Sequence, residues 1–534
     1  MRWTRHNTYF SEVMQLKGKL MTNMVFTISA LLIGVLAVLG AVIPEKFGHA
    51  AAYLFNLTTN YFGWFYLLSI FMIILFLFGV AISKYGGIRL GQDDAQKPDY
   101  PFFTWIGMLF SAGFGVGLVF WGVAEPMTHF FTPPFAGMES QSIEAARVAM
   151  GYAFFHFGIS QWSVFALVGL VIAFFQFRKK KDGLVSTALE PITGQKRAVK
   201  DTIDILAVIA TVMGVATSVG LGVLQMGGGV SILTGWENTP LLQIGVLGLI
   251  FICYMISTTT GLDKGIKYLS NFNLGMALAF LLFVFFAGPS VFILETFTLA
   301  IGDYISNFIQ YSLRLQPYAG GEWVRKWTIF YWAWAIAWSP FVGAFVARVS
   351  RGRTVREFIL GVMVVPPLIA CMWMAVFGGT ALWLDMNQNA GIATAVYHDV
   401  STALFELIEL LPLSDIVHVL SLLLILTFLI TSADSATYIL SSMTTSGSLN
   451  PPFYVKMVWG ILMASIAGVL LYTGGLEALQ TASLISALPF TIILLLLVIA
   501  VIRMFKGEPL PIRKADVKRF KRLEEAVNKS RKQR

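Results

Sequence analysis

Three glycines, Gly113, Gly115 and Gly117, alternate within the apolar stretch SAGFGVG that begins at Ser111. Because glycine has no Cβ, a backbone amide at such a position can approach a bound carboxylate closely, and the positive end of a half-helix adds to the attraction. The same small residues can instead let two helices pack closely. The stretch is therefore a candidate anion-binding segment, with close helix packing as the alternative.

Two tryptophans form a second candidate site. Trp334 and Trp338 are four residues apart, and Ser339 and Pro340 follow directly. On a helix this spacing places both indoles on one face, beside a proline that removes a backbone hydrogen bond. An indole face attracts a cation by roughly 0.5 to 2 kcal/mol. The pair is thus a candidate contact for a cationic ligand, and core packing is the other explanation.

The elements that must position these residues are membrane helices. The chain has 534 residues, of which 57% are hydrophobic and only 13% charged. About 20 apolar residues cross a hydrocarbon core of about 30 Å. Twelve such windows start near Thr22, Trp64, Phe102, Met150, Ile203, Leu241, Leu274, Trp327, Phe358, Ile416, Val458 and Ala482. We predict an all-α polytopic membrane protein with 12 transmembrane helices.

The positions of lysine and arginine predict the orientation, because cytoplasmic loops hold the excess of basic residues. With both termini inside, 33 of the 38 basic residues lie on the cytoplasmic side. We expect a cytoplasmic tail at 1–20, a transporter domain at 21–504 and a basic cytoplasmic tail at 505–534. That last tail either binds anionic lipid or is simply solvated. Basic residues scattered over short loops give no indication of a nucleic-acid partner.

The interrupted stretches at Ser111 to Gly117 and Trp338 to Gly343 fall in the third and eighth spans, and each is expected to unwind or kink. Such a pair in corresponding halves points to a transporter's binding site. The offset of five spans predicts that spans three to seven and eight to twelve form an inverted repeat, preceded by two peripheral spans. Before Trp327, the positions of Ile301, Ile305 and Phe308 predict an amphipathic surface helix.

Four stretches carry a resemblance to a transporter family: SAGFGVGLVFWGVAEP from Ser111, FHFGISQW from Phe155, WTIFYWAWAIAWSPFVGAFVARVSRGR from Trp327 and TSADSAT from Thr431. The chain is similar to the betaine/carnitine/choline family over about 31–502, and the tryptophan-rich stretch is the most specific part. The resemblance implies a LeuT-like fold and uptake of small compounds that bear a quaternary ammonium and usually a carboxylate. It also implies a homotrimer in the inner membrane of a bacterium.

The resemblance further implies an aromatic box around the cation, with three rings in the fourth span and one in the eighth. Aligned motifs place these positions at Phe157, Trp162, Phe165 and Ala335. A trimethylammonium group has no hydrogen to donate, so aromatic faces recognise it. In this chain two positions hold the weaker phenylalanine face and Ala335 supplies no ring. The substrate is therefore the least certain part of the resemblance.

The expected function is secondary active import of a glycine betaine-like osmolyte by alternating access. Because the box is altered, the alternative is the same fold with choline, carnitine, or a sulfonium or sulfonate osmolyte. An ion channel is a remoter alternative, since the sequence has no repeated acidic ring or filter-like motif. The expected substrate-binding residues are Phe157, Trp162, Phe165, Trp334, Trp338, Gly113, Gly115 and Gly117.

Sodium is the expected coupling ion, because backbone carbonyls of a broken helix and hydroxyl groups are hard oxygen ligands. By the resemblance, one sodium site falls on Ser111, Phe114, Phe428, Thr431 and Ser432. A second falls on Thr211 and Phe341, but its remaining position is Val215, which offers no hydroxyl. We expect no other cofactor.

Other polar residues in the spans are open to two interpretations. His156 is expected to make a structural hydrogen bond, and Asp434 is expected either to orient the neighbouring sodium-site turn or to act itself. The sequence contains no HExxH motif and no paired carboxylates in the membrane, so we do not expect this protein to be an enzyme. Cys253 and Cys371 lie inside predicted spans and indicate packing rather than thiol chemistry.

Overall fold

The computed structural model describes residues 23–92, 96–113, 115–135, 137–260, 263–318, 320–509 and 523, with the backbone alone at 110–113, 259–260 and 263–267. The helices are α2 Met24–Val42, α3 Pro44–Ile82, α4 Phe102–Gly113, α5 Val116–Phe131, α6 Ile143–His156, α7 Ile159–Ala173, α8 Val185–Ala188, α9 Glu190–Thr193, α10 Arg197–Thr234, α11 Pro240–Thr260, α12 Asp263–Ala287, α13 Ser290–Ser312, α14 Glu322–Val324, α15 Phe330–Val349, α16 Val355–Gln388, α17 Ile392–His398, α18 Ala403–Glu409, α19 Ser414–Met443 and α20 Phe453–Lys506. The predicted tails 1–20 and most of 505–534 lie outside the described residues.

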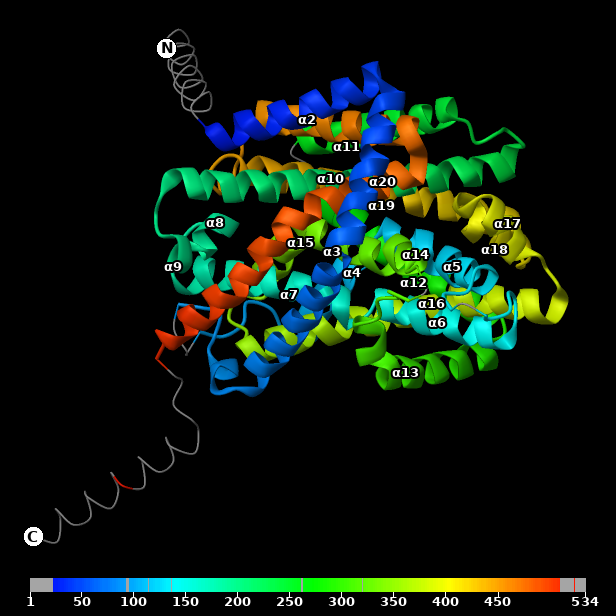
Figure 1. The fold of residues 1–534 in the computed structure, drawn as a ribbon, viewed down its shortest axis with the longest axis horizontal. Coiled ribbons are helices and arrows are strands. Elements are labelled where there is room, and N and C mark those ends of the chain that lie inside the picture. Colours follow the sequence, from blue (N-terminus) through cyan, green and yellow to red (C-terminus); the bar gives the residue numbers. More distant parts are fainter. Residues whose placement is uncertain are drawn as a thin grey trace, which may run out of the picture.

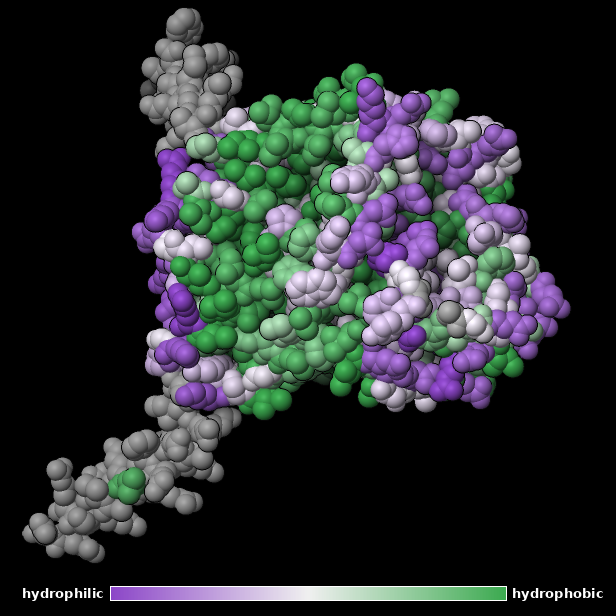
Figure 2. All heavy atoms as spheres, in the orientation of Figure 1, coloured by the Kyte–Doolittle hydropathy of each residue, from purple (hydrophilic) through white to green (hydrophobic). Residues whose placement is uncertain are grey.

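Within the described part of the chain, ten helical segments are long and apolar enough to cross a membrane. They are Met24–Val42, Pro44–Ile82, Ile143–Arg178, Arg197–Thr234, Pro240–Thr258, Tyr268–Ala287, Glu322–Val349, Val355–Gln388, Ser414–Met443 and Phe453–Lys506. The space-filling view shows a broad apolar band on the visible face, with polar residues at both ends of the long helices (Figures 1 and 2). The chain is thus an all-helical polytopic membrane protein, as predicted.

Glycine residues interrupt the membrane helices at two places. α4 ends at Gly113, and Gly115 has an extended backbone (φ −159°, ψ 172°) before α5 begins. α20 has 54 residues and is broken at Gly474 and Gly475. At about 1.5 Å per residue it would be about 80 Å long if straight, far more than one crossing needs. Gly475 has a φ of 55°, which glycine adopts without the strain that a Cβ would bring.

Of the unwinding or kink predicted for the eighth span, the structure shows no unwinding. α15 stays helical from Phe330 to Val349, with Pro340 inside it. Proline has no N–H to donate to the carbonyl of Ile336 one turn back. The hydroxyl of Ser339 donates to that carbonyl at 2.7 Å instead. The freed carbonyl is therefore satisfied locally, and the helix does not unwind at this position.

α7 and α15 cross with their backbones in contact. A Cβ built on Gly343 would lie 3.0 Å from the backbone nitrogen of Gly169, and one on Gly169 would lie 3.1 Å from the carbonyl oxygen of Gly343. Small residues at a crossing let helices approach this closely in a membrane. The contact fixes the two helices that carry most of the predicted aromatic residues.

α13 lies at the edge of the bundle against α6 and α16, and it is not one of the ten candidate spans (Figure 1). The predicted helix is present, and a stripe other than its predicted apolar face packs against the bundle. Ile305 is 71% exposed, whereas Ala300, Tyr304 and Tyr311 are buried. The face of α13 that packs against α6 is the one that contains Tyr304, because the rings on that face fill the space between the two helices.

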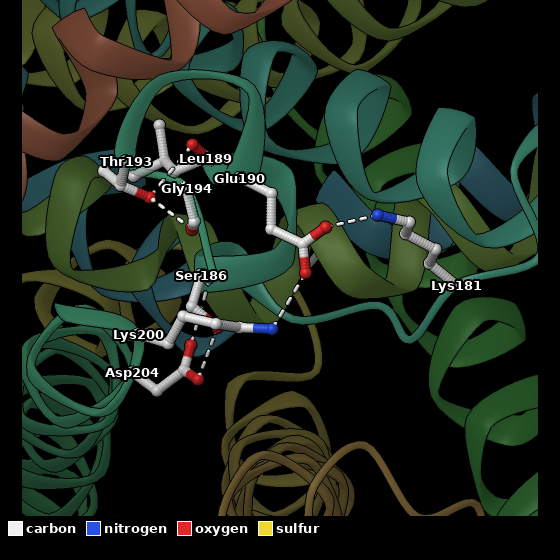
Figure 3. Close-up of polar contacts among 8 residues, drawn as sticks. All are labelled: Lys181, Ser186, Leu189, Glu190, Thr193, Gly194, Lys200 and Asp204. Atoms are coloured by element: carbon white, nitrogen blue, oxygen red, sulfur yellow. Dashed lines mark hydrogen bonds and ion pairs between the residues drawn. The ribbon is translucent and has the colours of Figure 1, made fainter. Parts of the chain in front are cut away.

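The segment between α7 and α10 is ordered by polar contacts (Figure 3). Glu190 lies between the side chains of Lys181 and Lys200 and pairs with both. Asp204 accepts hydrogen bonds from the backbone N–H and the hydroxyl of Ser186, at 3.1 and 2.6 Å. These contacts hold the short helices α8 and α9 against the end of α10.

Candidate functional site

A cavity of about 700 Å³ lies between α11, α12, α15, α19 and the segment before α20. Its lining includes Trp338 and Phe341 from α15 and Phe428, Thr431 and Ser432 from α19. The volume is in the range of small-molecule sites. The structure therefore brings together five of the residues that the sequence predicted for substrate or sodium.

Two basic side chains line this cavity, Arg348 near the end of α15 and Lys456 near the start of α20. In the orientation predicted from lysine and arginine, these segments face the cytoplasm, which remains a prediction for the side on which the cavity lies.

Trp338 is the aromatic residue best placed to meet a ligand. Its indole N–H is shielded from solvent and has no hydrogen-bond partner among the described residues. One side of the indole lies against Gly214, where a Cβ would approach its Cδ1 atom to 2.9 Å. The edge of the ring meets Phe341 at a centroid distance of 5.5 Å. A buried donor without a partner costs free energy, so a rearrangement that opens this N–H to the cavity would favour an anionic partner such as a carboxylate.

Trp334 lies one turn before Trp338 and does not line this cavity. Its indole rests on Gly117, at which a Cβ would lie 2.3 Å from the ring atom Cη2. Its N–H donates to the hydroxyl of Ser218 at 3.2 Å. Of the two interpretations of the glycine stretch, close packing describes Gly117 in this structure.

The three predicted rings of the fourth span lie elsewhere in the bundle. Phe157 occupies the break between α6 and α7 and meets Tyr331 edge to face, at a centroid distance of 5.4 Å. Trp162 and Phe165 form an edge-to-face pair at 5.3 Å. All three are at most 5% exposed, and none lines the cavity beside Trp338. Ala335 is also buried, 1% exposed.

The predicted sodium residues fall into two groups. The hydroxyl of Thr431 donates toward carbonyls of its own helix and accepts from Asn273 at 3.2 Å, on the cavity wall. Thr211 is fully buried, donates to the carbonyl of Ala207 at 2.8 Å and does not line the cavity. Val215 beside it is 1% exposed. Phe114 and the side chain of Ser111 lie outside the described part of the chain.

Around Asp434, three residues that the sequence did not single out complete the cavity wall: Ser257, Thr258 and Asn273. Asp434 accepts hydrogen bonds from Ser257 at 2.9 Å and from Thr258 at 2.5 Å, and all three line the cavity with Asn273. Asp434 therefore links α19 to α11. Sequence reasoning weighed Asp434 only against its neighbours in the chain, because nothing in the sequence indicates which residues of α11 it meets.

One group of side chains has the composition of a metal site. Ligand atoms of Glu125, His129 and His156 lie within 4.8 Å of one another and are buried. However, His156 pairs with Glu125 at 2.5 Å and with Thr328 at 3.0 Å, and the second oxygen of Glu125 accepts from Tyr331 at 2.6 Å. Glu125 and His156 thus have partners, whereas both ring nitrogens of His129 are buried without a hydrogen bond among the described residues, and its Nε2 lies 3.3 Å from a carboxylate oxygen of Glu125. We interpret the group as a polar network that joins α5, α6 and the segment leading into α15.

Comparison with known proteins adds independent information. Residues 24–510 match the model of the family described as BCCT, betaine/carnitine/choline family transporter. The chain is 60% identical over 489 residues to the ectoine/hydroxyectoine transporter of Virgibacillus pantothenticus, covering 91% of this chain and 97% of that protein. It is 43% identical over 481 residues to the glycine betaine transporter OpuD of Bacillus subtilis, covering 89% and 93%. It is 42% identical over 491 residues to a probable glycine betaine transporter of Desulfitobacterium hafniense, covering 91% and 98%.

Proposed function

The chain belongs to the betaine/carnitine/choline family of transporters, and from this we propose that it is a secondary active importer with ectoine or hydroxyectoine as its main substrate. As a member of that family it is a multi-pass compatible-solute transporter and not an enzyme. The first expectation from the sequence was a glycine betaine-like substrate. A 60% identical relative that is named for ectoine and hydroxyectoine favours the alternative of a different substrate on the same fold.

The altered aromatic box supports this choice. Ectoine carries its positive charge on a planar amidinium that bears N–H groups. It can therefore stack on one indole and also donate hydrogen bonds, whereas a trimethylammonium group depends on several ring faces. With phenylalanine at 157 and 165 and alanine at 335, the aromatic box offers fewer and weaker ring faces to a trimethylammonium group. Glycine betaine is the second candidate, because relatives at 43% and 42% identity are named for it.

We place the substrate against Trp338. Its ring face would stack with the amidinium, and its indole N–H, buried and unpaired in this state, would donate to the substrate's carboxylate once the indole moves away from Gly214. Phe157, Trp162, Phe165, Trp334 and the backbone from Gly113 to Gly117 are proposed to meet the substrate in another state of the transport cycle. Alternating access moves one half of such a bundle against the other around the site. In this proposal the cavity is the release path to the cytoplasm.

Sodium is the proposed coupling ion. Phe428, Thr431 and Ser432 line the same cavity as Trp338, so ion and substrate would lie close together. With Val215 lacking a hydroxyl, we propose one sodium ion per cycle. One charge that crosses about 100 mV supplies about 2.3 kcal/mol, which supports roughly a fiftyfold gradient of a zwitterion.

The proposed architecture has twelve spans in the inner membrane of a bacterium, with both termini in the cytoplasm. α4 and α5 together form one span, and α20 forms two on either side of Gly474 and Gly475. With the remaining nine candidate spans, this gives a LeuT-like five-plus-five inverted repeat after two N-terminal spans. A homotrimer remains part of the proposal by family resemblance.

Uptake of labelled ectoine into proteoliposomes, with and without an inward sodium gradient, tests the function. We expect sodium-dependent uptake that unlabelled hydroxyectoine inhibits more strongly than glycine betaine, choline or carnitine does. Stronger inhibition by glycine betaine would favour the second candidate. Uptake that persists unchanged without sodium would contradict the coupling, and absence of uptake of every solute would contradict the function.

A further inference from the structure

The fourth span is interrupted immediately before α7. α6 ends at His156 and α7 begins at Ile159, and the residue before α7, Gly158, has no side chain with which to cap the helix. The first N–H groups of a helix have no partner within it. Here the N–H of Ile159 donates to the phenolic oxygen of Tyr304 at 2.9 Å. A residue 145 positions away in sequence therefore caps this helix.

The break is shaped to admit that phenol. A Cβ on Gly158 would lie 2.3 Å from the hydroxyl oxygen of Tyr304 and 2.6 Å from the carbonyl oxygen of Phe154. Both distances are far below van der Waals contact. Only glycine at this position leaves room for the hydroxyl, and Tyr304 is 5% exposed. The contact between Tyr304 and the start of α7 thus depends on the packing of both partners: glycine at 158 leaves room for the hydroxyl, and the ring of Tyr304 is buried.

Tyr304 belongs to α13, the helix at the edge of the bundle. α13 is held to α6 by the guanidinium of Arg147, which donates to both carboxylate oxygens of Asp303 at 2.7 and 2.6 Å. The ring of Tyr311, two turns on, stacks on Tyr152 at a centroid distance of 4.2 Å. α13 therefore presents Tyr304 from a fixed position.

We propose that Tyr304 is a positioning residue for the substrate site, a role that rests on the function proposed above. Phe157 lies in the break itself, and Trp162 lies one turn into the helix that Tyr304 caps. By fixing where α7 begins, the hydroxyl sets the positions of both rings relative to the substrate. A small displacement of such rings weakens binding because contact with a cation depends on distance and orientation.

Tyr304→Phe isolates this contact, since the substitution keeps the ring and removes only the hydroxyl. We expect the KM for ectoine uptake to rise about fivefold to twentyfold, the range set by loss of one buried hydrogen bond. The Vmax and the sodium concentration for half-maximal uptake should stay within about twofold, because the predicted sodium residues lie on other helices. Loss of protein stability alone would lower the Vmax and would not raise the KM selectively.

Tyr311→Phe is the matched control, because it removes a hydroxyl from the same helix at a ring that stacks on α6. Its KM should equal that of the unmodified chain. Gly158→Ala is a second, independent variant: it keeps the hydroxyl but displaces it, and it should raise the KM as Tyr304→Phe does.

The outcomes separate this inference from the function on which it rests. If the unmodified chain transports ectoine or glycine betaine and Tyr304→Phe has the same KM, the positioning role is wrong. A lower Vmax or less protein in the membrane, with KM unchanged, also overturns it, because that result indicates a purely structural contact. If the unmodified chain transports no solute, the proposed function fails, and the positioning role fails with it.

Discussion

The indole of Trp334 lies directly on Gly117, so that a Cβ at residue 117 would be 2.3 Å from Cη2 of the ring. This contact joins α5, just after the break at Gly115, to the tryptophan face of α15. Trp338 lies one turn further along that face, with the two ring centroids 6.3 Å apart. Residue 117 therefore determines where the first of two adjacent indoles can lie.

Gly117→Ala should displace Trp334 and weaken substrate binding. The added methyl group has no free space, and the ring is held on its other side by the hydrogen bond to Ser218. We expect a rise in KM of about tenfold or more, together with some loss of stability from overpacking, about 1 to 3 kcal/mol. Gly107→Ala in α4 is the control, since no described atom lies within 4 Å of a Cβ there. Equal KM values in the two variants would refute the role of Trp334.

Substitutions of Trp338 distinguish its two proposed contacts. Trp338→Phe removes the N–H but keeps a ring, and should raise the KM about fivefold through loss of the carboxylate hydrogen bond. Trp338→Ala also removes the stacking face and should raise the KM by a further factor of about five. Trp236→Phe is the control, because that indole is 65% exposed at the end of α10. If both Trp338→Ala and Trp162→Ala leave uptake affinity unchanged, the substrate binds elsewhere.

The two predicted threonine positions should differ in their effect on sodium. Thr431→Val removes a hydroxyl from the cavity wall, and we expect the sodium concentration for half-maximal uptake to rise about tenfold. Thr211→Val removes a hydroxyl that is bonded within its own helix, away from the cavity, and sodium dependence should stay unchanged. The measurement is initial uptake rate against sodium at saturating substrate. A large effect of Thr211→Val would indicate a second sodium ion.

The ordered segment between α7 and α10 predicts a pH effect on stability. Burial raises the pKa of Glu190, but hydrogen bonds and charges from Lys181 and Lys200 lower it more, so that the pKa is below its ordinary value. Glu190 therefore stabilises the folded protein at pH values above its unfolded pKa, and this contribution is lost as the pH falls through the lowered folded value. Because both lysines are partly exposed, the contribution is about 0.5 to 1 kcal/mol.

Thermal unfolding of Glu190→Gln in detergent, measured from pH 7 down to acid, tests this. The variant should be slightly less stable than the unmodified chain at pH 7, and the difference should disappear at acid pH. A difference that persists below the lowered pKa would mean that Glu190 acts through packing rather than charge. Glu139→Gln, at an exposed position before α6, should show no difference at either pH.

Local features of the sequence predicted the class of the molecule and most of the elements of its fold. Hydropathy and helix length are local properties that the bilayer constrains directly, so the spans can be located without knowing their neighbours. The same holds for the break at Gly115 and for the presence of the surface helix α13. Motifs of the third, eighth and tenth spans predicted the family that the comparisons confirm.

Which side chains meet could be seen only in the folded bundle. It placed Trp338 with Thr431 on one cavity and kept Trp162 and Phe165 away from that cavity. It turned Tyr304 rather than Ile305 toward the bundle. It also kept α15 helical through Pro340, where the sequence predicts unwinding or a kink. The physical reason is that, within lipid, apolar residues are tolerated on every face of a helix, so periodicity does not indicate which face packs against which neighbour. That choice comes from helix packing and from polar groups finding partners far away in the chain.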